Sequence, residues 1–193
     1  MLDPNSDILN ALYRGQRDEA TRLAGTASSL TIWEAAALGR DADVEMLLER
    51  DAAQANAFAP DGHVPVGLAA FFGHPSTVKL LLDRGADVQA AARNEMKVQP
   101  LHAAVAGRNA DAVAAILDRG ADPNARQQVG YTPLMGAAGG NREDLVELLL
   151  ARGADPSLVS EDGKTAGDIA AAHGFATLAG RLEMLDTRSK TGR

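Results

Sequence analysis

The chain has 193 residues, no cysteine and a formal net charge of −7, and it is 46% hydrophobic and 4% aromatic. This composition supports a folded core and excludes disulfide scaffolds, cysteine-based metal sites and thiol nucleophiles. The acidic balance argues against nucleic acid as a partner, because phosphate binding needs a basic surface. No apolar run approaches the roughly 18–20 residues that cross a bilayer. The acidic N-terminal segment does not resemble a secretory signal, so we expect a soluble, cytoplasmic protein.

A Gly-Ala-Asp motif recurs along the chain. It begins at Gly85, Gly120 and Gly153, at spacings of 35 and 33 residues, and each copy follows an apolar stretch. Aligning these stretches on one position gives six copies, at Ala20, Val44, Val78, Val113, Val146 and Ala179. Repetition at this period is typical of a solenoid of small stacked units.

Each unit is predicted to contain two short helices. In the clearest copy, Thr132 caps the first helix and Pro133 takes its first position, where the missing N–H costs nothing. The second helix carries an apolar stripe over residues 145–150 and ends before Gly153. Helices this short are unstable alone, so the units must bury their apolar faces against one another.

Two motifs are similar to those of a known family. A helix start has the sequence Gln-Pro-Leu-His-Ala-Ala at 99–104 and Thr-Pro-Leu-Met-Gly-Ala at 132–137, with a weaker copy at 64–69, and a turn Gly-Ala-Asp-Pro-Asn stands at 120–124. In these motifs the chain resembles the ankyrin-repeat family, whose helix start is T-P-L-H-x-A. The resemblance implies an all-α solenoid of six stacked helix-turn-helix units with β-hairpin-like finger loops. It also implies a non-catalytic module that binds another protein.

We expect one domain over residues 5–185, with its end units acting as caps. The expected units are 5–27 (the N-terminal cap), 29–58, 59–91, 95–126, 127–159 and 160–185 (the C-terminal cap). The finger loop that follows Gly85 is two residues longer than the one that follows Gly120. Residues 187–193 contain basic side chains and no acid, and we expect them to form a flexible tail.

The sequence shows no pattern for catalysis or metal binding. The four histidines (His63, His74, His102 and His173) lack the helical spacing of a zinc site, and no G-x-S-x-G nucleophile motif is present. The family resemblance implies structural roles for His102 and His74. We therefore predict no enzyme activity, no metal and no cofactor.

The resemblance implies a concave docking face, formed by the finger loops and the exposed ends of the first helices. Phe71 and Phe72 stand at such an end, and the equivalent positions in the next two units hold alanine and glycine. We expect an apolar ridge beside a shallow floor, bordered by polar fingers. The candidate partner-binding residues are Trp33, Leu38, Asp61, His63, Phe71, Phe72, Arg93, Asn94, Glu95, Met96, Lys97, Gln127, Gln128 and Tyr131.

Alternatives to a monomer that binds a different protein stay open at this point. The phenylalanine pair could join two copies of the chain into a homodimer. The concave face could instead hold a small molecule or a reaction, although its floor offers alanine and glycine where titratable groups would be needed. Nucleic-acid binding would require clustered arginines, and the fifteen arginines do not cluster.

Overall fold

The computed structural model describes residues 6–191, which form helix pairs joined by loops and contain no β-strand. The pairs are α1 (Asp7–Tyr13) with α2 (Arg17–Thr26), α3 (Ile32–Leu38) with α4 (Asp41–Arg50), α5 (Pro65–Phe72) with α6 (Pro75–Asp83), α7 (Pro100–Ala106) with α8 (Ala110–Asp118), α9 (Pro133–Gly139) with α10 (Glu143–Ala151), and α11 (Ala166–Ala172) with α12 (Ala176–Thr191). Two short 3₁₀ helices, Ala52–Asn56 and Gln128–Gly130, lie in the loops.

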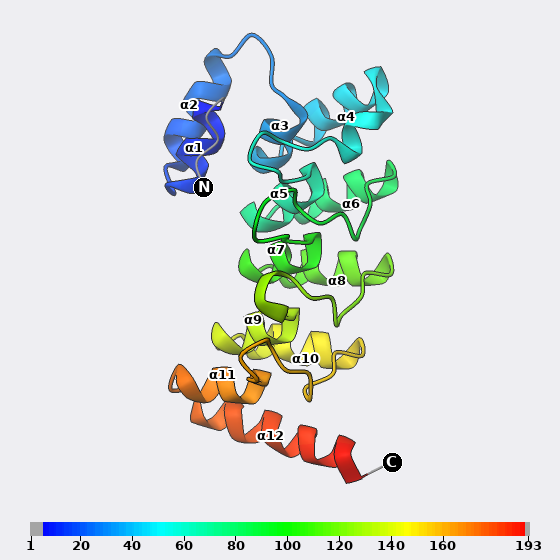
Figure 1. The fold of residues 1–193 in the computed structure, drawn as a ribbon. Coiled ribbons are helices and arrows are strands. Elements are labelled where there is room, and N and C mark those ends of the chain that lie inside the picture. The colour runs from blue at the N-terminus through cyan, green and yellow to red at the C-terminus, as the bar shows by residue number, and fades with distance from the viewer. Residues whose placement is uncertain (1–5, 192–193) are drawn as a thin grey trace.

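Five of these pairs, from α3/α4 to α11/α12, stack in one row (Figure 1). A single apolar core follows the row from Ile32 to Leu182, built largely of alanine, valine and leucine. Helices of seven to ten residues are stable here because each is covered by its neighbours. The predicted all-α repeat solenoid is confirmed.

The first helices start and stop at positions that the sequence specifies. Proline begins α5, α7 and α9, and the predicted cap at Thr132 is confirmed, since its hydroxyl accepts from the Met135 N–H at 3.3 Å. Each first helix is followed by a residue with positive φ, which reverses the chain into the second helix. In two units that residue is not glycine but Arg108 (φ 57°) or Asn141 (φ 50°).

Arginines tie each second helix to the one before it. Each guanidinium reaches a carboxylate about one repeat earlier in the chain. The pairs are Arg84–Glu45, Arg119–Asp83, Arg152–Asp118 and Arg181–Glu147. These side chains are partly or fully exposed, so each pair contributes at most about 1 kcal/mol. Their repetition helps to fix the register between units.

The finger loops close as hairpins without forming strands. In three fingers one backbone N–H···O bond joins the two sides of the loop, from Ala59 to His63, from Gln127 to Tyr131 and from Ser160 to Lys164. The finger after Gly85 closes between Ala92 and Val98, so its loop is two residues longer than the other three, as its sequence predicts. β-hairpin-like loops are therefore present, but their pairing is too short to count as sheet.

The α1–α2 pair, called the N-terminal pair below, does not cap the row as predicted for residues 5–27. It lies beside α3 and α5, on the side opposite α4 and α6 (Figure 1), and residues 27–31 cross the end of the row to reach α3. The outer end of the row is α4, where Met46 stays 40% exposed. The described chain thus has six helix pairs, of which five are stacked in line.

The C-terminal unit continues the row, and α12 extends beyond its expected end. The helix runs on to Thr191, because no proline or glycine interrupts residues 186–191. The flexible tail predicted for 187–193 therefore differs from the structure over 187–191. Residues 192–193, and residue 5 at the other limit of the predicted domain, lie outside the described range.

Neighbouring first helices approach so closely that Gly107 cannot carry a side chain. A Cβ there would lie 2.6 Å from the carbonyl oxygen of Ala70 and closer still to that of Phe71. At Gly180 in α12 the corresponding point has no heavy atom within 4 Å apart from the adjacent backbone of its own helix. We expect Gly107→Ala to lower the free energy of unfolding by about 1–3 kcal/mol, measured by urea denaturation. Gly180→Ala is the matched control and should be neutral or slightly stabilising; equal losses in both variants would contradict the close approach.

Candidate functional site

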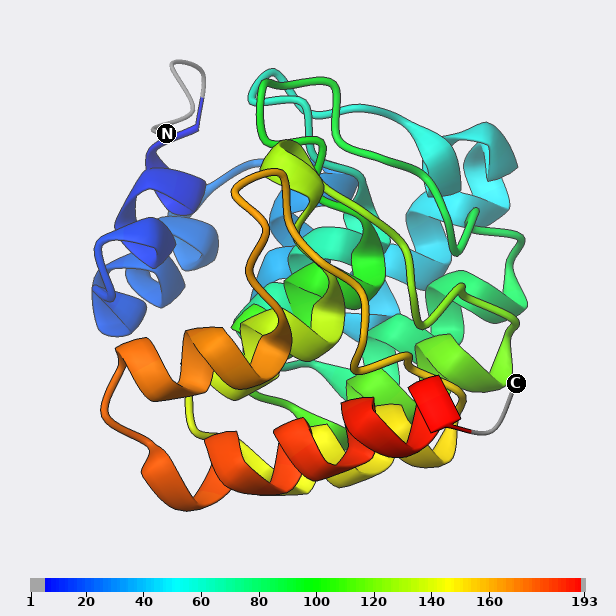
Figure 2. The same cartoon turned by 60° about the horizontal axis from the view of Figure 1, so that its bottom comes forward.

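Successive finger loops are held side by side by single backbone hydrogen bonds. The Arg93 N–H donates to the Gly62 carbonyl at 2.8 Å and the Gln128 N–H donates to the Met96 carbonyl at 3.1 Å. A third bond joins the following pair of fingers. Gly62 is required here, because its φ is +87° and a Cβ would lie 2.8 Å from the Arg93 backbone. Figure 2 shows the fingers gathered along one edge of the row.

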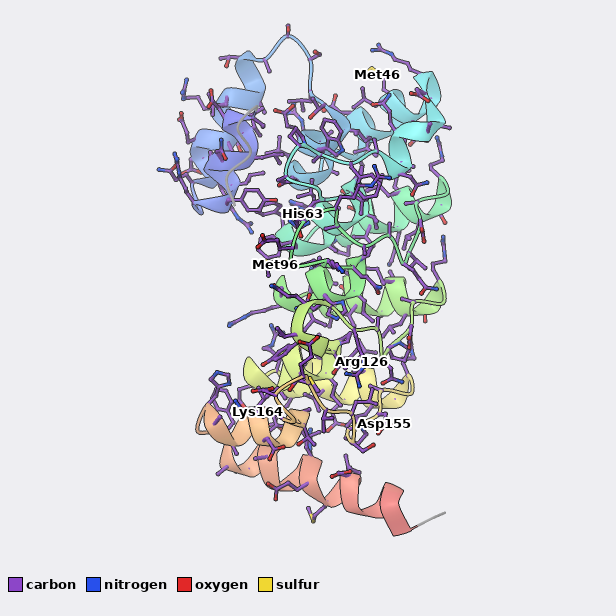
Figure 3. All side chains as sticks on the ribbon, in the orientation of Figure 1. Met46, His63, Met96, Arg126, Asp155 and Lys164 are labelled. Carbon is purple, nitrogen blue, oxygen red and sulfur yellow. The ribbon has the colours of Figure 1, made fainter. Side chains whose placement is uncertain are left out.

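An apolar groove runs between these fingers and the first helices α5 and α7. It holds about 300 Å³, and Phe71, Met96 and Val98 contribute to its walls. A second hollow of about 180 Å³ continues it towards α9 and shares His102, Ala106 and Gln127 with it. We call the two together the concave groove. In Figure 3 its residues His63 and Met96 lie close together on the side of the row that faces the N-terminal pair.

Of the two adjacent phenylalanines, only Phe71 lines the open groove. Phe71 is 40% exposed and lines the groove, whereas Phe72 is 9% exposed and packs under the N-terminal pair. Neighbouring residues on a helix point about 100° apart, so one of the two faces the fingers and the other faces α1. Phe72 is therefore covered by the N-terminal pair in this structure and does not line the open groove.

Asp61 also has a structural role. The residue is 6% exposed, and its carboxylate accepts from the Tyr13 hydroxyl at 2.8 Å and from the His63 N–H at 3.0 Å. The Asp61 carboxylate is therefore already bonded to two donors, and little of its surface is left for a partner. The prediction of Asp61 as a contact residue is therefore corrected.

Trp33 and Leu38 are both half-buried and face the N-terminal pair. The Trp33 indole N–H donates to the Ala57 carbonyl at 3.0 Å, and its ring packs against the row core as well as the N-terminal cluster. Leu38 packs against the same cluster and borders a small hollow with Leu12. Neither side chain belongs to the open groove.

The long finger places Met96 over the groove. The Asn94 amide donates to the Asp61 carbonyl at 3.0 Å, and its oxygen accepts from the N–H groups of Met96 and Lys97. These bonds shape the loop, and Met96 emerges 53% exposed. Arg93 is exposed but lies over the Phe58 ring, with 3.7 Å between its guanidinium carbon and the ring centroid.

Glu95 and Lys97 at the tip of the long finger are exposed. On the next finger Gln128 is exposed, while Gln127 and Tyr131 are half-buried and line the concave groove. Most predicted finger residues therefore stay candidates. Four groove residues, Tyr13, Val98, His102 and Ala106, are absent from the predicted contact set. Tyr13 and Ala106 stand at first-helix ends, where the family resemblance places the concave face, whereas no sequence signal marked Val98 or His102 as groove residues.

His102 joins the groove floor to the next finger. Its ring is buried, and its Nε2 lies 3.2 Å from the Tyr131 carbonyl oxygen. Because a carbonyl only accepts, Nε2 carries the proton. Burial lowers the pKa of His102, and it also lowers the pKa values of His63 and His74. The predicted structural roles of His102 and His74 agree with their backbone contacts, since His74 Nε2 lies 3.0 Å from the Ala37 oxygen.

Within residues 6–191, no three His, Cys, Asp or Glu side chains gather as metal ligands. No helix in that range has the length and hydropathy to cross a membrane. The groove brings together apolar side chains, amides and neutral imidazoles. This set can bury an apolar side chain and exchange a few hydrogen bonds with it.

The lowered histidine pKa values predict a loss of stability in mild acid. An unfolded histidine takes up a proton near pH 6.5, whereas the buried His102 resists protonation, so the unfolded state binds more protons as the pH falls. We expect the free energy of unfolding in urea to be lower at pH 5.5 than at pH 7.5. His102→Gln, which keeps a donor for the Tyr131 carbonyl, should reduce that difference; an unchanged difference would exclude His102 as its source.

Comparison with known proteins locates the repeats. A family model described as ankyrin repeats (3 copies) matches residues 32–127 and, overlapping them, residues 101–185. These matches cover the five stacked pairs and leave out the N-terminal pair. No curated protein matches the chain in sequence.

Proposed function

Since the chain belongs to the ankyrin-repeat family, whose repeats are generally protein-binding modules, we propose that it works without catalysis and binds a protein partner in the concave groove. The observation that carries the proposal is the exposed apolar lining of that groove, with Phe71 and Met96 on its rim. Exposed apolar patches bounded by polar residues are typical of interaction sites.

The groove and the fingers together indicate the chemistry of the partner. An apolar side chain of the partner would fill the space between Phe71, Met96 and Ala106. The finger tips add both signs of charge through Arg93, Glu95 and Lys97. Such a surface suits a protein segment with an apolar anchor and polar flanks. The proposal includes a cytoplasmic location. It includes no nucleic-acid or membrane partner, because the net charge is −7 and no apolar run in the sequence is long enough to cross a bilayer.

The rigid row favours such binding. Its units are fixed by a continuous core, by arginine–carboxylate pairs and by finger-to-finger hydrogen bonds. A preformed surface loses little conformational entropy when a partner docks.

Two methionines allow a matched test of the proposal. Met96 is 53% exposed on the groove rim, whereas Met46 is 40% exposed on α4, far from the groove (Figure 3). For a partner identified by affinity capture, we expect Met96→Ala or Phe71→Ala to raise the Kd about tenfold, as truncation of a central apolar contact does. Met46→Ala should leave the Kd, measured by titration calorimetry, within twofold. Equal effects of Met96→Ala and Met46→Ala would show that the partner does not bind in the groove.

Self-association is the second candidate, because Phe71 and Met96 expose apolar area next to each other. If two copies pair through this patch, light scattering with size exclusion should show a dimer whose fraction rises with concentration. Phe71→Asp should then restore the monomer. A monomer at every concentration excludes this candidate, and Phe72→Asp is unsuitable as a test because it would disturb the buried N-terminal cluster.

A further inference from the structure

The N-terminal pair buries an apolar cluster of its own. Leu9 and Leu12 of α1 share this cluster with Ala37 of α3 and with Leu68 and Phe72 of α5. None of these five residues belongs to the core that follows the row. Leu30 and Trp33, both partly buried, pack against both clusters. Because the buried members of the two clusters are distinct, the N-terminal cluster can open while the row core stays packed.

Polar contacts complete the attachment. The Ser6 hydroxyl donates to the Glu34 carboxylate at 2.7 Å, and the Tyr13 hydroxyl donates to the Asp61 carboxylate at 2.8 Å. The Arg17 guanidinium lies 3.5 Å from the last carbonyl oxygen of α5. Water can replace each of these donors when the pair detaches, so each hydrogen bond adds only a little to the free energy that holds the pair on the row.

The surface beneath the N-terminal pair is continuous with the concave groove. The Tyr13 ring lines the end of the groove and lies 5.3 Å, centroid to centroid, from the covered Phe72. Phe72 in turn lies 5.1 Å from the exposed Phe71. A partner that extends along the groove towards α3 therefore meets Tyr13 first.

We propose that the N-terminal pair is a resident occupant of the docking surface, and that a partner presenting a short apolar helix replaces it on the ends of α3 and α5. The inference rests on the proposed function. The N-terminal pair shows that this surface accepts an apolar helix face, since Ile8, Leu9 and Leu12 lie on one side of α1. Residues 27–29 between α2 and α3 are exposed and non-helical, so they can serve as the hinge.

The missing native cysteines permit a direct test of the opening, without any partner. Ala37 lies under the N-terminal pair and Ala104 lies in the row core, and both are 0% exposed. We expect Ala37→Cys to react with iodoacetamide at least tenfold faster than Ala104→Cys, followed by mass spectrometry under native conditions. Adding Tyr13→Phe should accelerate labelling at residue 37 several-fold and leave labelling at residue 104 unchanged. Equal rates at the two sites would overturn the proposal, since the pair would then open only when the row unfolds.

Replacement is tested with the segment itself as the probe. In an Ala37→Cys chain weakened by Leu9→Ala and Leu12→Ala, an excess of a peptide of residues 6–28 should slow labelling at least fivefold, and a scrambled peptide should not. If the peptide does not slow labelling, the proposal that an outside helix replaces the N-terminal pair is wrong. If circular dichroism shows that the weakened chain is unfolded, Tyr13→Phe takes the place of the two leucine changes. A captured partner that ignores Phe71→Ala and Met96→Ala would instead overturn the proposed function, without affecting the labelling result.

Discussion

Close approach between short helices is the constraint on which the molecule depends. The first helices have seven or eight residues, too few to be stable in water, and they become stable by packing almost backbone to backbone. Alanine at many core positions and glycine at residue 107 make this distance possible. The same small residues leave a shallow floor between the finger loops and the helix ends. The concave groove is therefore a result of how the row is stabilised.

The stacked row could be predicted from the sequence because its determinants are local and repeated. The period of about 33–35 residues, the proline starts and the apolar stripes each recur, so an error in one copy is corrected by the others. The hairpin finger with two extra residues could be predicted for the same reason.

The position of the N-terminal pair could not be predicted, because its contacts do not recur along the chain. Tyr13 meets Asp61 across 48 positions, and nothing in the repeat specifies that pairing. Without it, the sequence does not show which of Phe71 and Phe72 is buried, since both stand at the end of the same apolar helix. The sequence predicts Asp61, Trp33 and Leu38 as contact residues for the same reason, since no repeat shows that α1 and α2 already cover the surface that these side chains face.

The two ends of the described chain leave the row on different sides. The N-terminal pair lies beside α3 and α5, and its Tyr13 lines the concave groove, whereas α12 forms the opposite end of the row and carries the chain to Thr191 (Figure 1). A fluorophore, bead or surface tether joined through the α12 end would keep the groove facing bulk solvent. The same attachment ahead of α1 would crowd the groove and pull on the helix that covers Phe72. The fold therefore favours attachment through the α12 end when the protein is immobilised on a sensor chip.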